Sequence, residues 1–580
     1  MKNLKIFALI VCTLFVVASC DESDFLDQQN PNTITPDTFW KSTTDFQSAL
    51  TTVYAATQFE SISGAGLAYE YIMADLSGTN WWHAGHFQWN NLAFTNAQPQ
   101  VREKWADLYV GIFRANQVLE ALAETTIEDL TEEDKLLMEG QAKFLRAFFY
   151  FQVAHTFGGA VIHTEVPKSP EEFTKPFSSI QEVTDQVLIP DLEFAATSLP
   201  QTWTGNDVGR ATWGAAKTML GKTHLFIGSF AEARDEFKEV IDAGVYSLVP
   251  DILDNFTSLN EHNSESIFEV VYSESLVPGV GGGLHDNNPQ AIGAEATTII
   301  SSMATQDKGG FHVVQPTYWM HELFIFDEPD SLDVKNIDGG VVYAQSRRMH
   351  ASIVDQNSDG LYYEDDANAA DAYNGGQSAY TKKWSNWYDR AGELTPFKSG
   401  INHRHIRYAD VLLMYAEAVL EADNDFETAI DYIDMVRERA GVFTLQEYLD
   451  ANSNTFPEFH KPLFASIGTT RSYVAPSKES VLTHLRMVER PLELYAEGHR
   501  FKDLARWGIG VEVFQARLNE EISRGDTDII DEHEALLDIN GPRNDFVVKA
   551  ARYIANPEVL KYLPIPSQEV QANPSLTSGN

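Results

Sequence analysis

The stretch from Glu489 to Gly508 constrains the fold of this chain more than any other segment. Glu489, Glu493 and Glu497 follow one another at intervals of four residues, so they share one stripe of a helix. Stacked carboxylates repel one another unless cations lie opposite them. Four arginines lie within a few turns of this stripe: Arg486, Arg490, Arg500 and Arg506. The stretch therefore predicts helices that are held together by ion pairs.

The same stretch carries an apolar face with one interruption. Apolar residues recur at the three- and four-residue steps of a helix: Leu485, Val488, Leu492, Tyr495 and Ala496. Pro491 lies inside this pattern, so a kink or a new helix start is expected there. Closely spaced glutamates also serve in acid–base and glycosidase chemistry. Alternating Glu and Arg on helices more often form structural ion pairs, and we favour that interpretation.

Composition excludes several classes of protein. The 580 residues are 43% hydrophobic and 12% aromatic, enough for a large core, so an intrinsically disordered protein is excluded. The net charge of −42 repels phosphate backbones, and no nucleic-acid partner is expected. The sequence contains no G-x-S-x-G, H-E-x-x-H or P-loop motif, so no enzyme is predicted.

The N-terminus resembles a bacterial lipoprotein signal. Lys2 and Lys5 precede an apolar run, residues 6–17, that is short for a membrane span. Val17-Ala18-Ser19-Cys20 resembles a lipobox, in which Cys20 is lipidated and becomes the new N-terminus; an ordinary cleaved signal is the alternative. Residues 1–19 are then removed together with Cys12, and residues 20–36 form an acidic tether. Cys12 and Cys20 are the sequence's two cysteines, so no disulfide scaffold or cysteine metal site is expected.

Paired helical patterns predict an all-α fold with a tetratricopeptide-like helical-repeat scaffold. Residues 211–227 and 230–243 form one predicted helix pair, and residues 408–422 and 426–440 repeat it. Further helices are predicted over residues 36–58, 102–123 and 131–156. We expect one compact body, residues 37–580, with helical repeats within 37–245 and 401–510.

Two stretches lack helical periodicity and are predicted to be loops. Residues 61–100 and the large insert 247–400 are rich in Gly, Asn and aromatic residues, with short β-prone pieces such as 267–272. Binding residues are commonly carried on such loops. Residues 562–574 are predicted to form an ordered, extended tail.

Aromatic residues in these loops predict a carbohydrate site. Sugar rings present apolar C–H faces that stack on aromatic planes, while carboxylates and amides bind their hydroxyls. The candidates are Asp75, Asn80, Trp81, Trp82 and His83 in the first loop, and Trp319, Trp384, Trp387 and Tyr388 in the insert. For each aromatic residue the alternative is a loop anchor packed onto the scaffold.

One motif resembles a calcium-binding loop. Asp355, Asn357, Asp359 and Gly360 match the pattern D-x-N-x-D-G, Leu361 would offer its carbonyl, and Asp366 occupies the twelfth position. Asp366 replaces the usual bidentate Glu, and flanking helices are not obvious. The alternative is an acidic turn held by Asx hydrogen bonds. No cofactor is required, and calcium is the one candidate ion.

Several segments together resemble the SusD/RagB family of outer-membrane glycan-binding lipoproteins. They are Phe39-Trp40, residues 105–116, 144–159, 209–212 and 407–418, the stretch Glu489 to Gly508, Pro564-Ile565-Pro566 and Asn573-Pro574. The resemblance implies four tetratricopeptide-like units, a loop-rich glycan-binding face and no catalysis. It implies a SusC-like TonB-dependent transporter as partner. It also implies surface exposure through the lipid anchor, which the acidic run Asp21-Glu22-Ser23-Asp24 fits.

The resemblance gives the location of the glycan site but not its residues. The loop after the first helix and the insert are the expected positions, and the insert adds Arg390 to the candidates. Calcium occurs in some members, which favours the Asp355 loop. Two other functions are compatible with the sequence: a protein- or peptide-binding repeat scaffold of the same transporter complex, and a carbohydrate-active hydrolase.

Overall fold

The structure is a computed structural model. It describes residues 39–79, 83–273, 295–305, 308, 310–338, 341–355, 357–363, 365–367, 379–388, 399–462, 470–526 and 543–576. The predicted signal peptide, Cys20 and the acidic tether lie outside these residues. Within them, no helix is long and apolar enough to cross a membrane.

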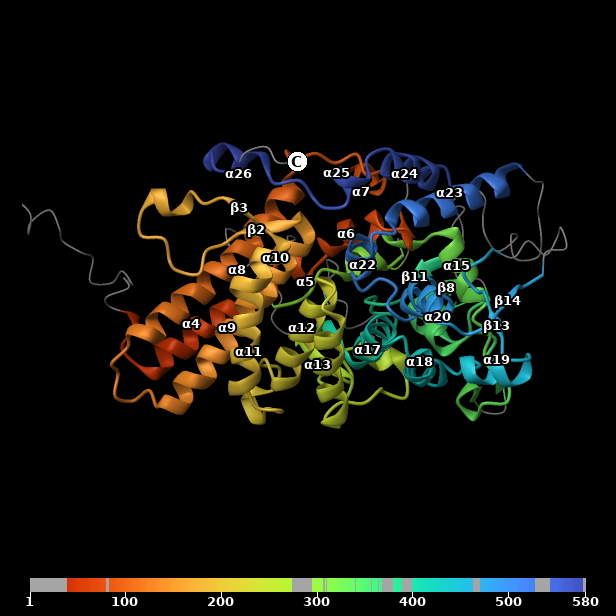
Figure 1. Ribbon diagram of the computed structural model, residues 1–580, viewed down its shortest axis with the longest axis horizontal. Helices are drawn as coiled ribbons and strands as arrows, with labels where there is room; N and C mark the ends of the chain where they lie inside the picture. Colours follow the sequence, from red (N-terminus) through yellow and green to blue (C-terminus); the bar gives the residue numbers. More distant parts are fainter. Residues whose placement is uncertain are drawn as a thin grey trace, which may run out of the picture.

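Eight helices form the scaffold, and each packs against the next one along the chain. They are α4 (Thr43–Thr57), α8 (Pro99–Glu124), α9 (Glu132–Phe157), α11 (Ile189–Ser198), α12 (Trp213–Phe226), α13 (Phe230–Asp242), α17 (Tyr408–Asp423) and α18 (Phe426–Ala440). Figure 1 shows them side by side, from α4 at the left to α18 at the right. The predicted all-α, tetratricopeptide-like scaffold is confirmed.

Local capping signals set the ends of these helices. The Thr131 hydroxyl accepts a hydrogen bond from the Asp134 backbone N–H and starts α9. Gly158, with φ of 80°, ends the same helix in the left-handed region that glycine adopts without steric cost. Asn424 and Gly441 end α17 and α18 in the same conformation.

The prediction of a loop over residues 61–100 is wrong in part. This stretch contains most of α5 (Glu60–Ser63), and all of α6 (Leu67–Met73) and α7 (Ala84–Asn90). Gly64 and Gly66 lie between the first two helices. All three helices are too short to show a helical period in the sequence. The extended tail is also wrong in part, because residues Ser567–Ala572 form helix α26.

The insert consists of short elements packed on the scaffold. Its helices are η4 (Ile252–Phe256), α14 (Ile300–Met303), α15 (Tyr318–Ile325), η7 (Val334–Asn336) and α16 (Arg347–Ser352). Its strands are β4 (Ser266–Val270), β5 (Gln315–Pro316), β6 (Ile337–Asp338), β7 (Val341–Val342), β8 (Ile353–Asp355), β9 (Leu361–Tyr362), β10 (Asp365–Asp366) and β11 (Ala379–Thr381). The strands form two-stranded antiparallel pairs, and β4 pairs with β12 (His403–Arg407) immediately before α17.

The remaining elements complete the described chain. Before the insert they are β1 (Ser77–Gly78), β2 (Gly159–Val161), η1 (Pro170–Phe173), β3 (Phe177–Ser179), α10 (Ile180–Val183), η2 (Thr184–Leu188) and η3 (Gly205–Asp207). After α18 they are α19 (Leu445–Ala451), β13 (Phe456–Pro457), β14 (Tyr473–Val474), α20 (Lys478–His484), η11 (Leu485–Glu489), α21 (Arg490–Glu493), α22 (Arg500–Trp507), α23 (Gly510–Asp526), α24 (Arg543–Ala555) and α25 (Pro557–Leu560).

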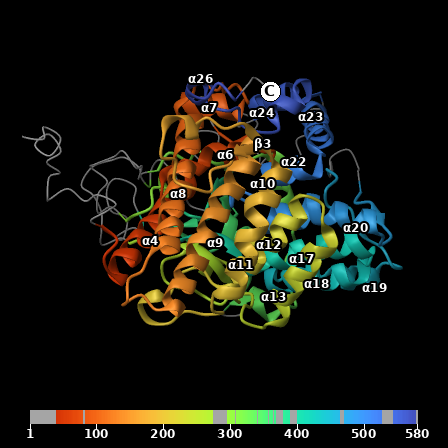
Figure 2. The same ribbon diagram turned by 60° about the vertical axis from the view of Figure 1, so that its left-hand side comes forward.

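One hydrophobic core joins the N-terminal and C-terminal parts of the chain. Its buried side chains run from Phe46 to Leu576 and include residues of the insert. The C-terminal helices lie along the same edge as α6 and α7 (Figures 1 and 2). The buried ammonium of Lys549 on α24 donates to the backbone oxygens of Ile72, Ala74 and Ser77, at 2.7, 3.0 and 2.8 Å.

The glutamates of the Glu489–Gly508 stretch form a buried ion-pair network, as predicted. Glu489, Glu493 and Glu497, which we call the glutamate row, are 0%, 1% and 7% exposed. The row's partners come from other elements: Arg348, Arg437 and His484 for Glu489, Arg407 and Arg439 for Glu493, and Arg407 and Lys383 for Glu497. The row therefore ties the insert, β12 and α18 to the C-terminal helices.

The arginines of the stretch itself bind other carboxylates. This corrects the expectation that they neutralise the glutamate row. Arg490 contacts Asp410 and Asp503, at 2.7 and 2.8 Å, and Arg500 contacts Asp75 at 2.7 Å. Arg486 and Arg506 contact Glu417. A π-helix, η11, ends at Glu489, and α21 follows it directly with Pro491 in its first turn. The irregularity expected at Pro491, a kink or a new helix start, takes the form of this π-helix, and the backbone stays helical through it.

Acidification is expected to weaken the protein through this network. Burial opposes the charge on Glu497, but Arg407 and Lys383 outweigh it and lower the pKa of this carboxyl from 4.5 to about 2. Between these values the unfolded chain binds more protons than the folded one, so the free energy of unfolding falls as pH drops through this interval. The Glu497→Gln variant should have a lower free energy of unfolding than wild type at neutral pH, and this free energy should fall less on acidification. Urea midpoints measured from about pH 7 to about pH 3 test this; equal acid losses in both proteins would contradict it.

Candidate functional site

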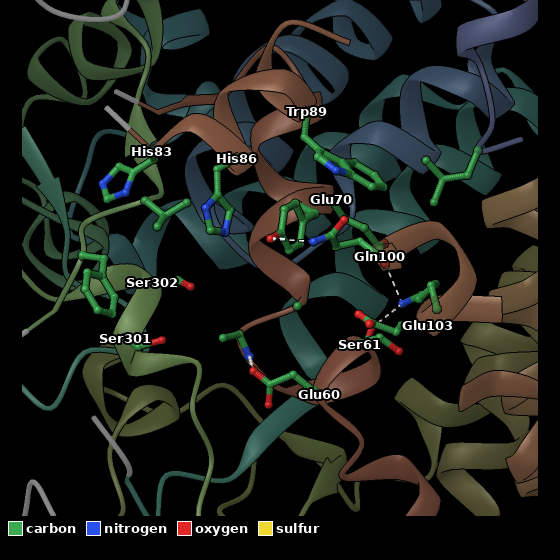
Figure 3. Close-up of a pocket in the computed structure, with 17 residues that line it drawn as sticks. Glu60, Ser61, Glu70, His83, His86, Trp89, Gln100, Glu103, Ser301 and Ser302 are labelled. Atoms are coloured by element: carbon green, nitrogen blue, oxygen red, sulfur yellow. Dashed lines mark hydrogen bonds and ion pairs between the residues drawn. The ribbon is translucent and has the colours of Figure 1, made fainter. Parts of the chain in front are cut away.

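A pocket of about 490 Å³ opens between the first short helices and the insert. We call it the first pocket. Its walls come from α5, α6, α7 and the start of α8 on one side and from Ser301, Ser302, Phe311 and Val313 on the other (Figure 3). Its lining residues include Glu60, Tyr69, Glu70, His83, His86, Trp89, Gln100, Glu103, Lys104 and Phe311. It is large enough for a small ligand, since ligand pockets commonly measure about 300–1,000 Å³.

Aromatic rings form one wall of the first pocket. Tyr69 and His86 are stacked, with ring centroids 4.4 Å apart and an interplanar angle of 12°. Trp89 packs behind Tyr69 at 5.1 Å and is 2% exposed. Phe311 belongs to the opposite wall and is 47% exposed. The pocket therefore offers flat apolar surfaces from two sides.

Polar groups lie beside these rings. The Gln100 amide donates to the Tyr69 hydroxyl at 3.3 Å. The Glu60 carboxylate accepts from the Thr298 hydroxyl at 2.6 Å and from the Ala65 backbone N–H at 3.1 Å, which fixes its orientation. Together with Glu103, these groups provide oxygen acceptors and an amide at the border of the aromatic wall, and such groups bind sugar hydroxyls.

An ion-pair cluster lies at one side of the pocket. Glu70 contacts Lys104 at 2.5 Å and Lys502 at 2.7 Å. Burial opposes the charge on Glu70, but the two ammonium groups outweigh it and lower the pKa of the carboxyl to about 2. Burial also lowers the pKa of His83, and burial together with His83 lowers that of His86 to about 4. At neutral pH both imidazoles are uncharged, and the charge of Lys104 is neutralised by Glu70.

Three of the predicted glycan contacts are wrong, because the structure places them in the interior. Asp75 is 0% exposed and binds Arg500. Trp319 is 4% exposed, and its indole N–H donates to the Asp75 backbone oxygen at 2.8 Å. Trp384 is 0% exposed, and its indole N–H donates to the Ala496 backbone oxygen at 2.8 Å. These rings cannot stack on a sugar at the surface; they are anchors of the insert, the alternative considered above.

The remaining candidates divide into three groups. His83 lines the first pocket. Trp387 and Tyr388 are partly buried away from it: the Lys382 ammonium lies 4.2 Å from the Trp387 ring centroid, and the Tyr388 hydroxyl accepts from the Ser258 backbone N–H at 2.8 Å. The last group, Asn80, Trp81, Trp82 and Arg390, lies outside the described residues and stays a prediction.

The residues of the Asp355 loop do not fit a calcium site. The Asp355 carboxylate is 1% exposed and binds His321, Gln345, Ser358 and the Asn357 backbone N–H. Asp359 accepts from the Ala344 backbone N–H, and Leu361 and Asp366 face each other in the β9–β10 pair. In the described part of the chain, no three His, Cys, Asp or Glu side chains gather into a metal-binding group. The alternative of an acidic turn agrees with the hydrogen bonds of Asp355 to Asn357 and Ser358.

Sequence reasoning missed most of the first pocket. Tyr69, His86, Gln100 and Phe311 were not among the candidates, although all line the pocket. Tyr69 and His86 could have been found if the short helices α6 and α7 had been recognised in the sequence, but this stretch was predicted to be a loop. No local signal connects Phe311 with residues more than two hundred positions earlier.

Comparison with known proteins identifies the family. A model described as the SusD family matches residues 264–580, and one described as "Starch-binding associating with outer membrane" matches residues 24–225. Because the first match covers more than half of the chain, this protein belongs to the SusD family.

Individual relatives resemble most of this chain. SusD-like protein P25 of Formosa agariphila is 25% identical over 533 residues, which cover 89% of this chain and 91% of that protein. A SusD superfamily protein of Bacteroides vulgatus has a TM-score of 0.71 at 24% identity, covering 93% of this chain and 99% of its own. A structure titled "Laminarin binding SusD-like protein" has a TM-score of 0.64 at 22% identity, covering 93% and 100%.

Proposed function

We propose that the protein binds neutral glycans at the first pocket and passes them to a SusC-like TonB-dependent transporter at the outer membrane. The observation that carries the proposal is the combination, in one pocket, of stacked aromatic rings with carboxylate and amide groups. Aromatic planes cover the apolar face of a sugar ring while the polar groups bind its hydroxyls. Membership of the SusD family supports this, and so does the laminarin-binding relative. The lipobox at Cys20 supports a lipid anchor and exposure at the cell surface.

Binding without catalysis agrees with the charges of the pocket. A glycosidase needs a carboxylic acid that gives up a proton to the leaving group. Glu70, with a pKa of about 2, is held ionised between Lys104 and Lys502 and is therefore a poor proton donor. Trp81 and Trp82 directly precede His83 in the sequence, and we keep them, with Asn80, as proposed contacts to the glycan.

The same charges favour neutral sugars over sulfated or uronate-containing ones. Glu60, Glu70 and Glu103 line the pocket with one lysine, Lys104, which is bonded to Glu70. An anionic sugar would be placed beside carboxylates, and like charges at an interface cost free energy.

Affinity gels with neutral polysaccharides, each paired with its sulfated derivative, test the proposal. We expect at least one neutral glycan to be retained unaltered and its sulfated form to bind about 10-fold more weakly or worse. Retention of no glycan would overturn the proposal, and shortened products would indicate a hydrolase instead. Tighter binding of the sulfated form would refute the charge argument.

A further inference from the structure

A second pocket of about 610 Å³ lies on another face of α8. Its walls come from three segments that are distant in the sequence: residues 105–117 of α8, residues 161–174 around η1, and residues 569–576 at the end of α26. Lys104 lines the first pocket and Trp105 the second. Successive helical residues point about 100° apart, so one helix contributes side chains to two separate pockets. None of the predicted site residues belongs to the second.

Aromatic side chains dominate the second pocket. Trp105 and Tyr109 come from α8, with His163 beside Tyr109, their ring centroids 6.5 Å apart. Phe113 on α8 and Phe173 on η1 are 37% and 53% exposed. Exposed phenyl rings cost free energy in water unless something covers them. Because the two rings come from different segments around one hollow, a ligand with flat apolar faces would cover them.

Two polar groups inside this apolar pocket have spare hydrogen-bonding capacity. The Nδ1 atom of His163 is buried and has no hydrogen-bond partner among the residues that the structure describes. The His163 backbone is fixed, since its N–H donates to the Tyr150 hydroxyl and its oxygen accepts from Asn116. Glu569 is half-buried, which raises the pKa of its carboxyl, and the Trp105 indole donates to it. This ring nitrogen therefore has capacity to bond a polar group of a ligand.

The chemistry of this partner follows from the groups present. Burial and Lys175 lower the pKa of His163 to about 4, so the ring is uncharged at neutral pH and offers one donor and one acceptor. The Glu569 carboxyl accepts a hydrogen bond from a hydroxyl and disfavours an anion. The Arg114 guanidinium is bonded to the Thr52 backbone oxygen, at 2.8 Å, and lies over the Phe59 ring. A neutral molecule with both hydroxyls and apolar ring faces satisfies all these groups, whereas a purely apolar one leaves His163 unpaired.

We propose that the second pocket is a second carbohydrate-binding site, which takes one or two neutral sugar rings independently of the first pocket. The proposal rests on the proposed function for the class of ligand and on the second pocket's own residues for the site. The two pockets are separated by one helix, so a single polysaccharide molecule would bind both. Once it is bound at one pocket, its effective concentration at the other is raised.

Isothermal titration of neutral hexasaccharides, laminarihexaose and maltohexaose among them, tests the proposal on the full chain. We expect two binding events for wild type. His163→Ala combined with Phe173→Ala should lose the second event and leave the affinity of the first unchanged. Leu332→Ala is the matched control, since Leu332 is 85% exposed and lines neither pocket. Thermal unfolding verifies that each variant is folded.

Hydrogen exchange separates the two sites without any substitution. With a hexasaccharide bound, exchange in residues 161–174 should slow, in addition to exchange near α6 and α7. A single binding event in wild type, with no protection of 161–174, overturns the second site and leaves the first intact. If a hexasaccharide protects only residues 161–174 and its affinity is unchanged by Tyr69→Ala, the second site is supported and the first is refuted. No binding of any hexasaccharide would overturn both.

Discussion

Glu493→Ala is expected to lower the free energy of unfolding by about 3–5 kcal/mol, the range found when one partner of a buried ion pair is removed. Glu493 is 1% exposed and accepts from Arg407 at 2.6 Å and from Arg439 at 2.5 Å. Without it, two guanidinium groups stay buried with less opposing charge. Urea denaturation followed by circular dichroism gives the change, provided that the slope with denaturant stays constant.

A partly exposed ion pair on a scaffold helix provides the control for this variant. Glu139 pairs with Lys143 one turn along α9 at 3.0 Å, and the two side chains are 30% and 21% exposed. Glu139→Ala should cost about 0–1 kcal/mol, as surface pairs do. Equal losses in both variants would contradict the structural role of the glutamate row. Loss of glycan binding at normal stability in Glu493→Ala would do so as well, because Glu493 lines neither pocket.

Tyr69→Ala is expected to weaken glycan binding at the first pocket by about 10-fold or more, the effect of truncating an aromatic residue at the centre of an interface. Tyr69 is stacked on His86 and backed by Trp89, so its loss removes the middle of the aromatic wall. The measurement is isothermal titration with whichever neutral glycan the affinity gels identify.

Tyr69→Phe is the matched control, since it keeps the ring and removes only the hydroxyl that Gln100 contacts. We expect it to bind more tightly than Tyr69→Ala and within about tenfold of wild type, because one neutral hydrogen bond contributes about 0.5–1.5 kcal/mol, or about 2- to 12-fold in affinity. Phe311→Ala, on the opposite wall, should weaken binding in the same direction as Tyr69→Ala. Wild-type affinity in both Tyr69→Ala and Phe311→Ala would remove the first pocket from consideration.

The scaffold was predictable because its helices carry their own signals. The pairs 211–243 and 408–440 show a helical period, short turns and capping residues, all within one window of sequence. The glutamate row was predictable as a stripe, yet its partners were not: Arg348 and Arg407 are far from it in the chain. Charge balance in a buried network depends on tertiary contacts that a local spacing does not encode.

The candidate site was predicted only in its neighbourhood. His83, in the region after the first scaffold helix, lines the first pocket, whereas Trp319 and Trp384 were assigned to a surface because the insert is rich in glycine and asparagine. The insert instead shares the main core, and Trp319 and Trp384 are buried in that core. Tyr69 and His86 were missed because α6 and α7 are too short to produce a visible period.

The contacts between the two ends of the chain have a consequence for how the native state is reached. Arg500 bonds Asp75 across 425 positions, and Lys549 bonds the Ile72 backbone across 477. Contacts of such separation require closure of very long loops, which slows folding and leaves apolar helix faces in water meanwhile. Partly folded chains of this kind aggregate readily. The N-terminal helices therefore complete their hydrophobic core only after the C-terminal helices have been synthesised and have packed against them.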